Sequence, residues 1–326
     1  MDYPDDNRSY SHGAVVMKPG KLIWIALLFA PLHLCCIKER CCGCDSHSVK
    51  DTTSLLVSFS GDYERGVVTK SSSSAFPAGI MTSIFAFSSG ENPAVYPSFP
   101  GTPIIAVSDI YGNLSVSSSK YLFVPAGIYD FYSVSANNQS LMDIKIEKGI
   151  SAPLINGVDY LWSSGRETEV KTNTNVSLVF SHRAARVVVT FTEGDGVRDL
   201  IVKNASIYAT KEGARMVLST GEIPPAGTVN SISIPMKVNY RSAEEIILPL
   251  QNGISIPFEV EIEASLSGVI VDSKIYRGLI PSPQGGFMGG NAYHFTAKVS
   301  STSITFFAAV TVEWEDKSIT NLDIYE

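Results

Sequence analysis

All five cysteines of this 326-residue chain lie at positions 35–44, directly after an apolar block. A thiol at the end of an export signal is where bacterial lipoproteins are cut and acylated. We favour Cys36 as that thiol, because it ends the apolar run and a polar tetrapeptide follows it. Cys35 precedes it, and Cys44 follows the small residue Gly43, so both stay open as alternatives.

The same cysteines could instead bind zinc, because thiolates are zinc ligands. A zinc finger needs further ligands at defined spacing, and His47 is the one histidine close behind the cluster. Beyond Cys44 the chain has no cysteine, so the folded body has neither a disulfide nor a thiolate nucleophile. Lipid attachment is therefore the preferred interpretation.

The apolar block itself has the layout of an export signal. Lys18 and Lys21 precede a run of about 13 residues, which fits a signal core of roughly 7–15 residues and is shorter than the ~20 that span a bilayer. Residues 17–44 are thus predicted to be a signal peptide with its cysteine cluster. The polar residues 1–16 are predicted to be a spurious or disordered extension.

The remaining sequence offers little that could do chemistry. It contains no GxSxG, P-loop, HExxH or glycine-rich dinucleotide motif. His182 and His294 are far apart, and each is more simply a strand histidine with its own partner than a metal ligand. Glu313 and Glu315 flank Trp314, which fits the solvent face of a strand with a buried tryptophan better than a cation site. We therefore predict no catalytic residue, no cofactor and no metal.

Composition points to strands and away from nucleic acid. The formal net charge of −7 argues against a nucleic-acid partner. Residues typical of strands are plentiful, and turn residues separate the apolar runs. The sequence predicts an all-β fold with strands at 54–59, 80–87, 104–107, 121–124, 129–136, 200–209, 231–238, 258–266, 269–276, 292–299, 303–314 and 318–325.

The stretch VSLVFSHRAARVVVTF carries the strongest strand signal. Leu178 and Phe180 alternate on one face, whereas Val187 and Val189 fall on the opposite parity. Because one strand exposes alternate residues to opposite faces, this switch predicts a bulge or turn near Ala184–Ala185.

The polar residues 151–175 are predicted to connect two domains, 51–168 and 169–326. A short internal repeat supports two similar domains, since Tyr129 with Phe131 and Tyr293 with Phe295 each follow a glycine-containing turn.

Residues 178–189, LVFSHRAARVVV, resemble the LxFxHxxAxVxV strand of the fimbrillin-like family, whose members are lipoprotein precursors of Gram-negative surface fimbriae. The segments 127–132, 159–162 and 291–295 agree with that resemblance. It implies two tandem transthyretin-like β-sandwich domains after a lipoprotein signal peptide. It also implies a structural or adhesive fimbrial subunit, whether stalk, tip or anchor, on the cell outer membrane.

The resemblance further implies assembly by strand exchange. Proteolysis would remove the first strand, and a strand of another fimbrial subunit would fill the groove, held by main-chain hydrogen bonds. The outer membrane would hold the precursor through its N-terminal lipid, and host or bacterial surface ligands are possible further partners.

Two segments fit these steps. Arg65 lies in a polar, glycine-flanked loop behind the first strand, so cutting there would detach Ser54–Phe59; Lys70 is the alternative. Near the C-terminus, Thr320, Leu322 and Ile324 share one parity and form a candidate donor strand. The alternative is that this segment is the last strand of the second domain.

A second functional hypothesis is a lipid-anchored surface protein that binds glycans. Exposed aromatic side chains would then stack on sugar rings, with Tyr96, Phe99, Tyr111 and Trp162 as candidates. Packing in a core is the competing explanation for each of them.

Overall fold

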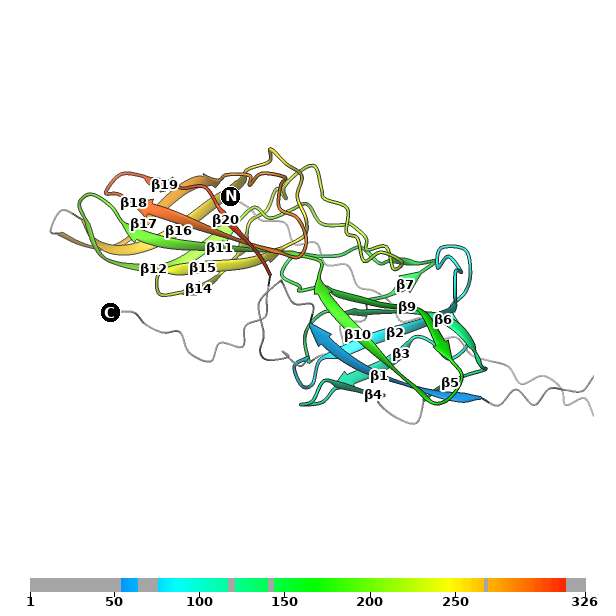
Figure 1. Cartoon of the computed structure of the whole chain (residues 1–326). Helices are drawn as coiled ribbons and strands as arrows, with labels where there is room; N and C mark the ends of the chain where they lie inside the picture. Colours follow the sequence, from blue (N-terminus) through cyan, green and yellow to red (C-terminus); the bar gives the residue numbers. More distant parts are fainter. Residues whose placement is uncertain (1–53, 64–75, 117–120, 140–143, 267–268, 315–326) are drawn as a thin grey trace, which may run out of the picture. The chain divides into compact units, whose positions relative to one another are not determined.

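The computed structural model describes residues 54–63, 76–116, 121–139, 144–266 and 269–314. Every helix or strand found there is a β-strand, which confirms the all-β prediction (Figure 1). Within these ranges, no helix is long and apolar enough to cross a membrane. All of them belong to one compact unit, Lys50–Glu326. The transthyretin-like tandem and the signal peptide stay predictions.

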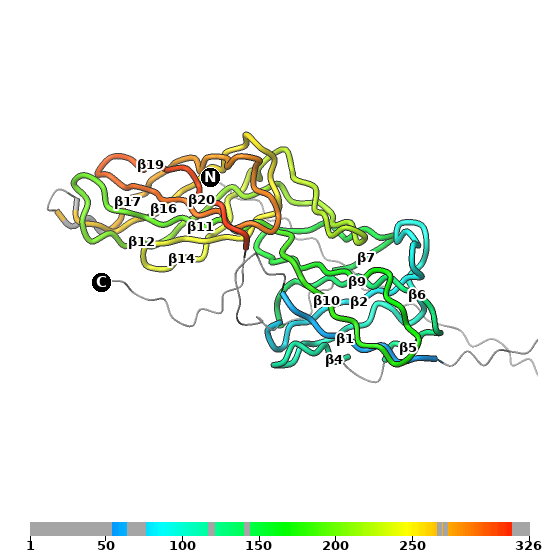
Figure 2. Tube along the Cα trace, in the orientation of Figure 1, coloured from blue at the N-terminus to red at the C-terminus, as the bar shows by residue number. Residues whose placement is uncertain are grey.

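The first sheet has the strand order β10-β9-β6-β2-β3-β4-β1-β5. Because β1 also pairs with β10, all of these strands except β5 form a closed ring. Figure 2 shows the blue β1 running alongside the green β10. The strands are β1 (Leu55–Tyr63), β2 (Met81–Ser88), β3 (Ile104–Ser108), β4 (Asn113–Val116), β5 (Leu122–Val124), β6 (Gly127–Ser135), β9 (Leu161–Val170) and β10 (Thr174–His182). A separate small sheet pairs β7 (Ile146–Glu147) with β8 (Ile150–Ser151).

The ring encloses one hydrophobic core. Its inward side chains alternate along each strand, as expected for strands with one buried face. The large members are Val57, Phe59, Tyr63, Phe76, Ile84, Ile104, Leu114, Tyr129, Phe131, Leu161, Val176, Leu178 and Phe180. Strand β1 therefore contributes to the same core as the strands that follow it.

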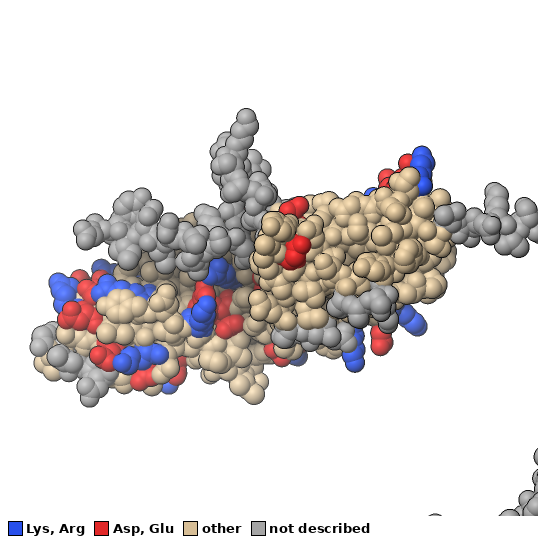
Figure 3. All heavy atoms as spheres, turned by 90° about the horizontal axis from the view of Figure 1, so that it is seen from below, with Lys and Arg blue, Asp and Glu red and all other residues tan. Residues whose placement is uncertain are grey.

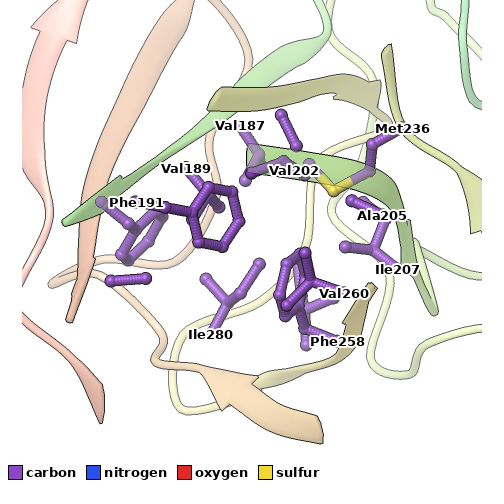
Figure 4. Close-up of a cluster of buried hydrophobic side chains, with 14 of the residues drawn as sticks. Val187, Val189, Phe191, Val202, Ala205, Ile207, Met236, Phe258, Val260 and Ile280 are labelled. Atoms are coloured by element: carbon purple, nitrogen blue, oxygen red, sulfur yellow. The ribbon is translucent and has the colours of Figure 1, made fainter. Parts of the chain in front are cut away.

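The rest of the described chain forms a sandwich of two sheets. One has the order β14-β15-β11-β18-β19, with β20 also paired to β18, and the other has the order β13-β12-β16-β17. Figure 4 shows Val187, Val189 and Phe191 of one sheet near Phe258 and Ile280 of the other. The strands are β11 (Ala185–Glu193), β12 (Val197–Ile207), β13 (Ile234–Pro235), β14 (Lys237–Asn239), β15 (Ser242–Ile247), β16 (Ile256–Leu266), β17 (Val269–Ile280), β18 (Asn291–Val299), β19 (Ile304–Phe306) and β20 (Val310–Glu313).

A third apolar cluster joins the ring to the sandwich. It combines side chains of the first sheet, of the segment between β6 and β9, and of the chain after β10. Its aromatic and large aliphatic members include Phe85, Phe87, Tyr132, Tyr160, Met216, Leu248 and Trp314. Main-chain hydrogen bonds reinforce it, as between the amide of Arg183 and the carbonyl of Tyr160 (2.7 Å).

The predicted change of face between Phe180 and Val187 is confirmed. β10 ends at His182 and β11 begins at Ala185, with the break at the two residues between them. Phe180 is buried in the core of the ring, whereas Val187 is buried in the core of the sandwich.

The prediction of a plain connection over 151–175 is wrong, because β9 occupies much of it and pairs with β6. Its charged residues Arg166, Glu167 and Glu169 are exposed, while Leu161, Ser163 and Val170 are buried. The domain limits 51–168 and 169–326 stay a prediction; the sheets change at the break between β10 and β11.

The position of Phe59 yields a stability prediction. Its side chain is 2% exposed and lies edge-on to Phe131 at 5.5 Å between ring centroids. Phe59→Ala should lower the free energy of unfolding by about 3–5 kcal/mol, because it leaves a cavity in the core. The control Ser58→Ala, on the exposed face of the same strand, should stay within about 0.5 kcal/mol. Equal, small effects in denaturant titrations would show that β1 does not belong to the core.

Candidate functional site: the groove filled by β1

Strand β1 is hydrogen-bonded along both of its edges. On one side it runs parallel to β10, in a register that starts at Val57 opposite Thr174 and ends at Tyr63 opposite Phe180. On the other side it pairs antiparallel with β5 and then with β4. A strand in this position fills a groove, and without it two rows of main-chain donors and acceptors would lose their partners.

The inward face of β1 fits the groove through residues of very different size. Val57, Phe59 and Tyr63 are buried, and each occupies the core of the ring. Gly61 lies between the last two, where a Cβ atom would stand 3.2 Å from Cε2 of Phe180. That distance is tighter than ordinary contact, so the groove narrows there.

The outward face of β1 is held more weakly. The amide of Leu56 donates to Oδ1 of Asn173 (3.1 Å), and Oγ of Ser58 donates to Oδ1 of Asn175 (3.0 Å). These bonds are exposed, so water replaces them at little cost. Most of the affinity of the groove for β1 must therefore come from the main-chain ladders and the buried side chains.

A polar network closes the groove at the C-terminal end of β1. The hydroxyl of Tyr63 donates to Oδ1 of Asn137 (2.9 Å), and Nδ2 of Asn137 donates to Oδ2 of Asp159 (2.7 Å). The other carboxylate oxygen of Asp159 is 2.8 Å from Nδ1 of His182. His182 is thus the paired strand histidine that the sequence favours over a metal ligand.

The imidazole of His182 also joins two aromatic rings. It stacks on Tyr63 with 5.7 Å between ring centroids and on Trp314 with 4.3 Å, and both pairs are nearly parallel. Tyr63 ends β1, and Trp314 is the last described residue. One buried histidine therefore contacts both the closing strand and the C-terminal end of the described chain.

β20 reaches Trp314 along the edge of β18. All four of its residues are exposed, and its register runs from Val310 opposite His294 to Glu313 opposite Asn291. Trp314 itself is buried, and its amide donates to the carbonyl of Gly290 (2.9 Å). β20 is therefore attached mainly by main-chain hydrogen bonds and by the tryptophan behind it.

The residues predicted for modification and exchange lie outside the described part of the chain. These are Cys35, Cys36 and Cys44 for lipidation, Arg65 for proteolysis, and Thr320, Leu322 and Ile324 for the donor strand. Their roles stay predictions. Strand β1 reaches Tyr63, four residues beyond the strand end expected at Phe59, so Arg65 follows its last residue closely in sequence.

The remaining candidates for chemistry are accounted for by local contacts. Among the described residues, no group of three or more His, Cys, Asp and Glu side chains could hold a metal. His294 lies on the outer face of β18, and partial burial together with the nearby Arg186 lowers its pKa. Trp314, directly after β20, is buried and Glu313 is exposed, whereas Glu315 lies outside the described residues.

The four aromatic residues considered for glycan binding divide into two pairs. Tyr96 and Tyr111 are exposed. Phe99 instead packs on Tyr129 with 5.9 Å between ring centroids, and the indole N–H of Trp162 donates to the carbonyl of Leu218 (2.7 Å). Only the first pair is free to meet a ligand in the described surface.

Charged side chains of both signs are mixed on the surface. Figure 3 shows acidic and basic residues side by side over one part of the visible face and few over the rest. Lys203 with Glu263 (2.8 Å) and Arg277 with Glu259 (2.6 Å) are such pairs. In these pairs the charge of each cation is balanced by a neighbouring carboxylate.

A family model described as fimbrillin-like matches residues 69–314, which is more than half of the chain. No curated protein sequence matches this chain.

Solved structures are similar at low identity. A protein of Bacteroides uniformis with a proposed role in cell adhesion has a TM-score of 0.57 and 15% identity, over 80% of this chain and 97% of that one. Another such protein, from Bacteroides ovatus, has a TM-score of 0.58 and 13% identity, over 81% and 99%. The tip fimbrial protein Mfa3 of Porphyromonas gingivalis, with a C-terminal truncation, has a TM-score of 0.47 and 8% identity, over 80% and 100%. At these identities the two Bacteroides structures show a shared fold and nothing further.

The polar network gives a testable consequence. Asp159→Ala removes the acceptor of Asn137 and the partner of His182, so it should lower the free energy of unfolding by about 1–3 kcal/mol. Asp62→Ala, at an exposed aspartate of β1, serves as the control and should change it by less than about 0.5 kcal/mol. If chemical denaturation gives the same value for both variants, the network does not hold this end of the groove.

Proposed function

The chain belongs to the fimbrillin-like family, and from this premise we propose that it is a structural and adhesive subunit of a surface fimbria that receives a strand of a neighbouring subunit in place of β1. The observation that carries the proposal is the two-sided pairing of β1, which closes the ring with the first strand of the described chain. The proposed role requires no catalytic site.

The energetics favour replacement of β1 over an empty groove. Each large side chain that β1 buries contributes about 1.5–3 kcal/mol, and Val57, Phe59 and Tyr63 would leave together. The open groove would also expose main-chain groups on β10 and on β4 and β5. An extended strand of another subunit restores both contributions, which is the physics of β-strand addition.

The same subunit would give its own C-terminal segment to the next one. Thr320, Leu322 and Ile324 are the residues that would enter the neighbour's groove, because they share one parity. The exposed β20 supports this role, since the strand that precedes the segment in the sequence is held mainly by main-chain hydrogen bonds and by the buried Trp314.

Export and maturation complete the proposal. The precursor is acylated at Cys36, with Cys35 and Cys44 as alternatives, and the lipid holds it at the outer membrane. Cleavage after Arg65 then frees β1 together with the lipid, because the bond follows the last residue of the strand by two positions. The partners are other fimbrial subunits, and the assembled fimbria presents the protein to host or bacterial surface ligands.

The donor assignment is tested in cells that assemble the fimbria. Leu322→Asp with Ile324→Asp should give a folded protein with unchanged Tm that is missing from sheared fimbriae, because charges cannot enter an apolar groove. The control Asn321→Ser with Asp323→Ser alters the opposite parity and should still be incorporated. A lower Tm for the first variant would instead assign the segment to the core of its own domain.

The lipid attachment is tested with a fatty-acid probe. Cys35→Ser with Cys36→Ser should abolish labelling and release the protein from the membrane fraction, since both candidate thiols after the apolar run are gone. Cys44→Ser alone should keep full labelling. Persistent labelling of the double variant would move the acylated residue to Cys44.

A further inference from the structure

The end of the β1 groove is shaped for one kind of side chain. We infer that it is a recognition subsite for tyrosine, and that it selects an incoming strand with the pattern large-x-Gly-x-Tyr, as in Phe59-x-Gly61-x-Tyr63. The inference rests on the proposed strand exchange and adds which strand is accepted. The residues that build the subsite are Phe76, Asn137, Asp159 and His182.

The ring of Tyr63 defines the apolar part of the subsite. It lies nearly parallel to the His182 imidazole, with an angle of 10° between the ring planes, and its centroid is 5.2 Å from that of Phe76. The side chain is 6% exposed. An aliphatic side chain would keep part of the burial and lose the ring contacts, which contribute beyond the buried area.

The polar part of the subsite presents an acceptor and not a donor. A carboxylate only accepts hydrogen bonds, so Asp159 fixes the amide of Asn137 with Nδ2 toward itself and Oδ1 toward Tyr63. Asn137 is held further by its main-chain N–H, which donates a hydrogen bond to Oγ of Ser135 (3.1 Å). A phenylalanine in place of the tyrosine would leave Oδ1 without the hydroxyl that it accepts.

Gly61 sets the register of the strand relative to this subsite. A slip by two residues would put the tyrosine where Gly61 lies, and there even a Cβ atom would come within 3.2 Å of Phe180. A slip by one residue would turn the tyrosine to the outer face. The narrow position and the tyrosine subsite together favour the register seen in the structure.

The pattern identifies the occupant as a strand of a different subunit. In segment 318–326 of this chain, the positions two and four after Thr320 are Leu322 and Ile324, where the groove needs Gly and Tyr. Two and four after Leu322 come Ile324 and Glu326, which fit no better. Two and four after Asn321 come Asp323 and Tyr325, which supply the tyrosine but put an aspartate where the groove needs Gly. The C-terminal segment of a second copy of this chain therefore lacks the pattern that β1 has.

The test uses the full chain with a specific protease site placed in residues 64–75, so that cutting leaves every residue present and β1 bound without a covalent link. A fluorescent peptide of residues 55–63 is added, and its uptake is followed by anisotropy against competing peptides. We expect the Tyr63→Phe peptide to bind about three- to tenfold more weakly and Tyr63→Leu more than about tenfold. The Asp62→Asn peptide should bind within about twofold of the parent.

A matched protein variant separates recognition from general packing. In Asn137→Gly the acceptor is gone, and glycine tolerates the left-handed backbone of this position (φ 46°). The tyrosine and phenylalanine peptides should then bind equally, whereas a purely structural role would preserve their difference.

Each remaining outcome decides one claim. If the parent peptide is never taken up, strand exchange itself is wrong. If the parent peptide is taken up and the Tyr63→Leu peptide binds as tightly as the parent, strand exchange stands and the tyrosine subsite is overturned. If a peptide of residues 318–326 binds as tightly as the parent, the occupant is not restricted to a different subunit.

Discussion

The structure of the first sheet depends on the two-sided hydrogen bonding of β1. All other strands of the ring are connected to one another without it, so β1 is the element that turns an open sheet into a closed one. It is also the first strand of the described chain. A strand with these properties is costly to remove and simple to replace, which is the physical basis for a subunit that exchanges it.

His182 extends the influence of this strand beyond the ring. Its ring lies between the tyrosine that ends β1 and Trp314, while Asp159 holds its Nδ1. The stack brings together residues from both ends of the described chain at the junction of the two cores. Tyr63, at the end of the groove, and Trp314, directly after β20, consequently both pack on the His182 imidazole. β1 and β20 nevertheless belong to different sheets.

Sequence patterns predicted the elements whose partners are close in sequence or whose faces are plainly marked. The change of parity between Phe180 and Val187 located the break between two cores, because side-chain alternation is a local property. Strand β9 was not predicted, because its sequence is mostly polar and carries little apolar alternation. Its pairing with β6, which is distant in sequence, determines its extended conformation. The groove could be anticipated only through family resemblance: the pairing of β1 with β10 joins residues more than 100 positions apart, as in Ser58 opposite Asn175, and no local pattern encodes such a register.

A covalent lock on β1 tests the central claim most directly. Ser60 of β1 and Asn113 of β4 are paired residues, so Ser60→Cys with Asn113→Cys should form a disulfide in a chain whose five native cysteines are replaced by serine. With the chain cut between β1 and Phe76, the oxidised protein should exclude a labelled peptide of residues 55–63. Reduction should restore uptake to the level of the same cut chain without the two new cysteines. Equal uptake by the oxidised and reduced proteins would show that the peptide binds elsewhere and that β1 is not the strand being replaced.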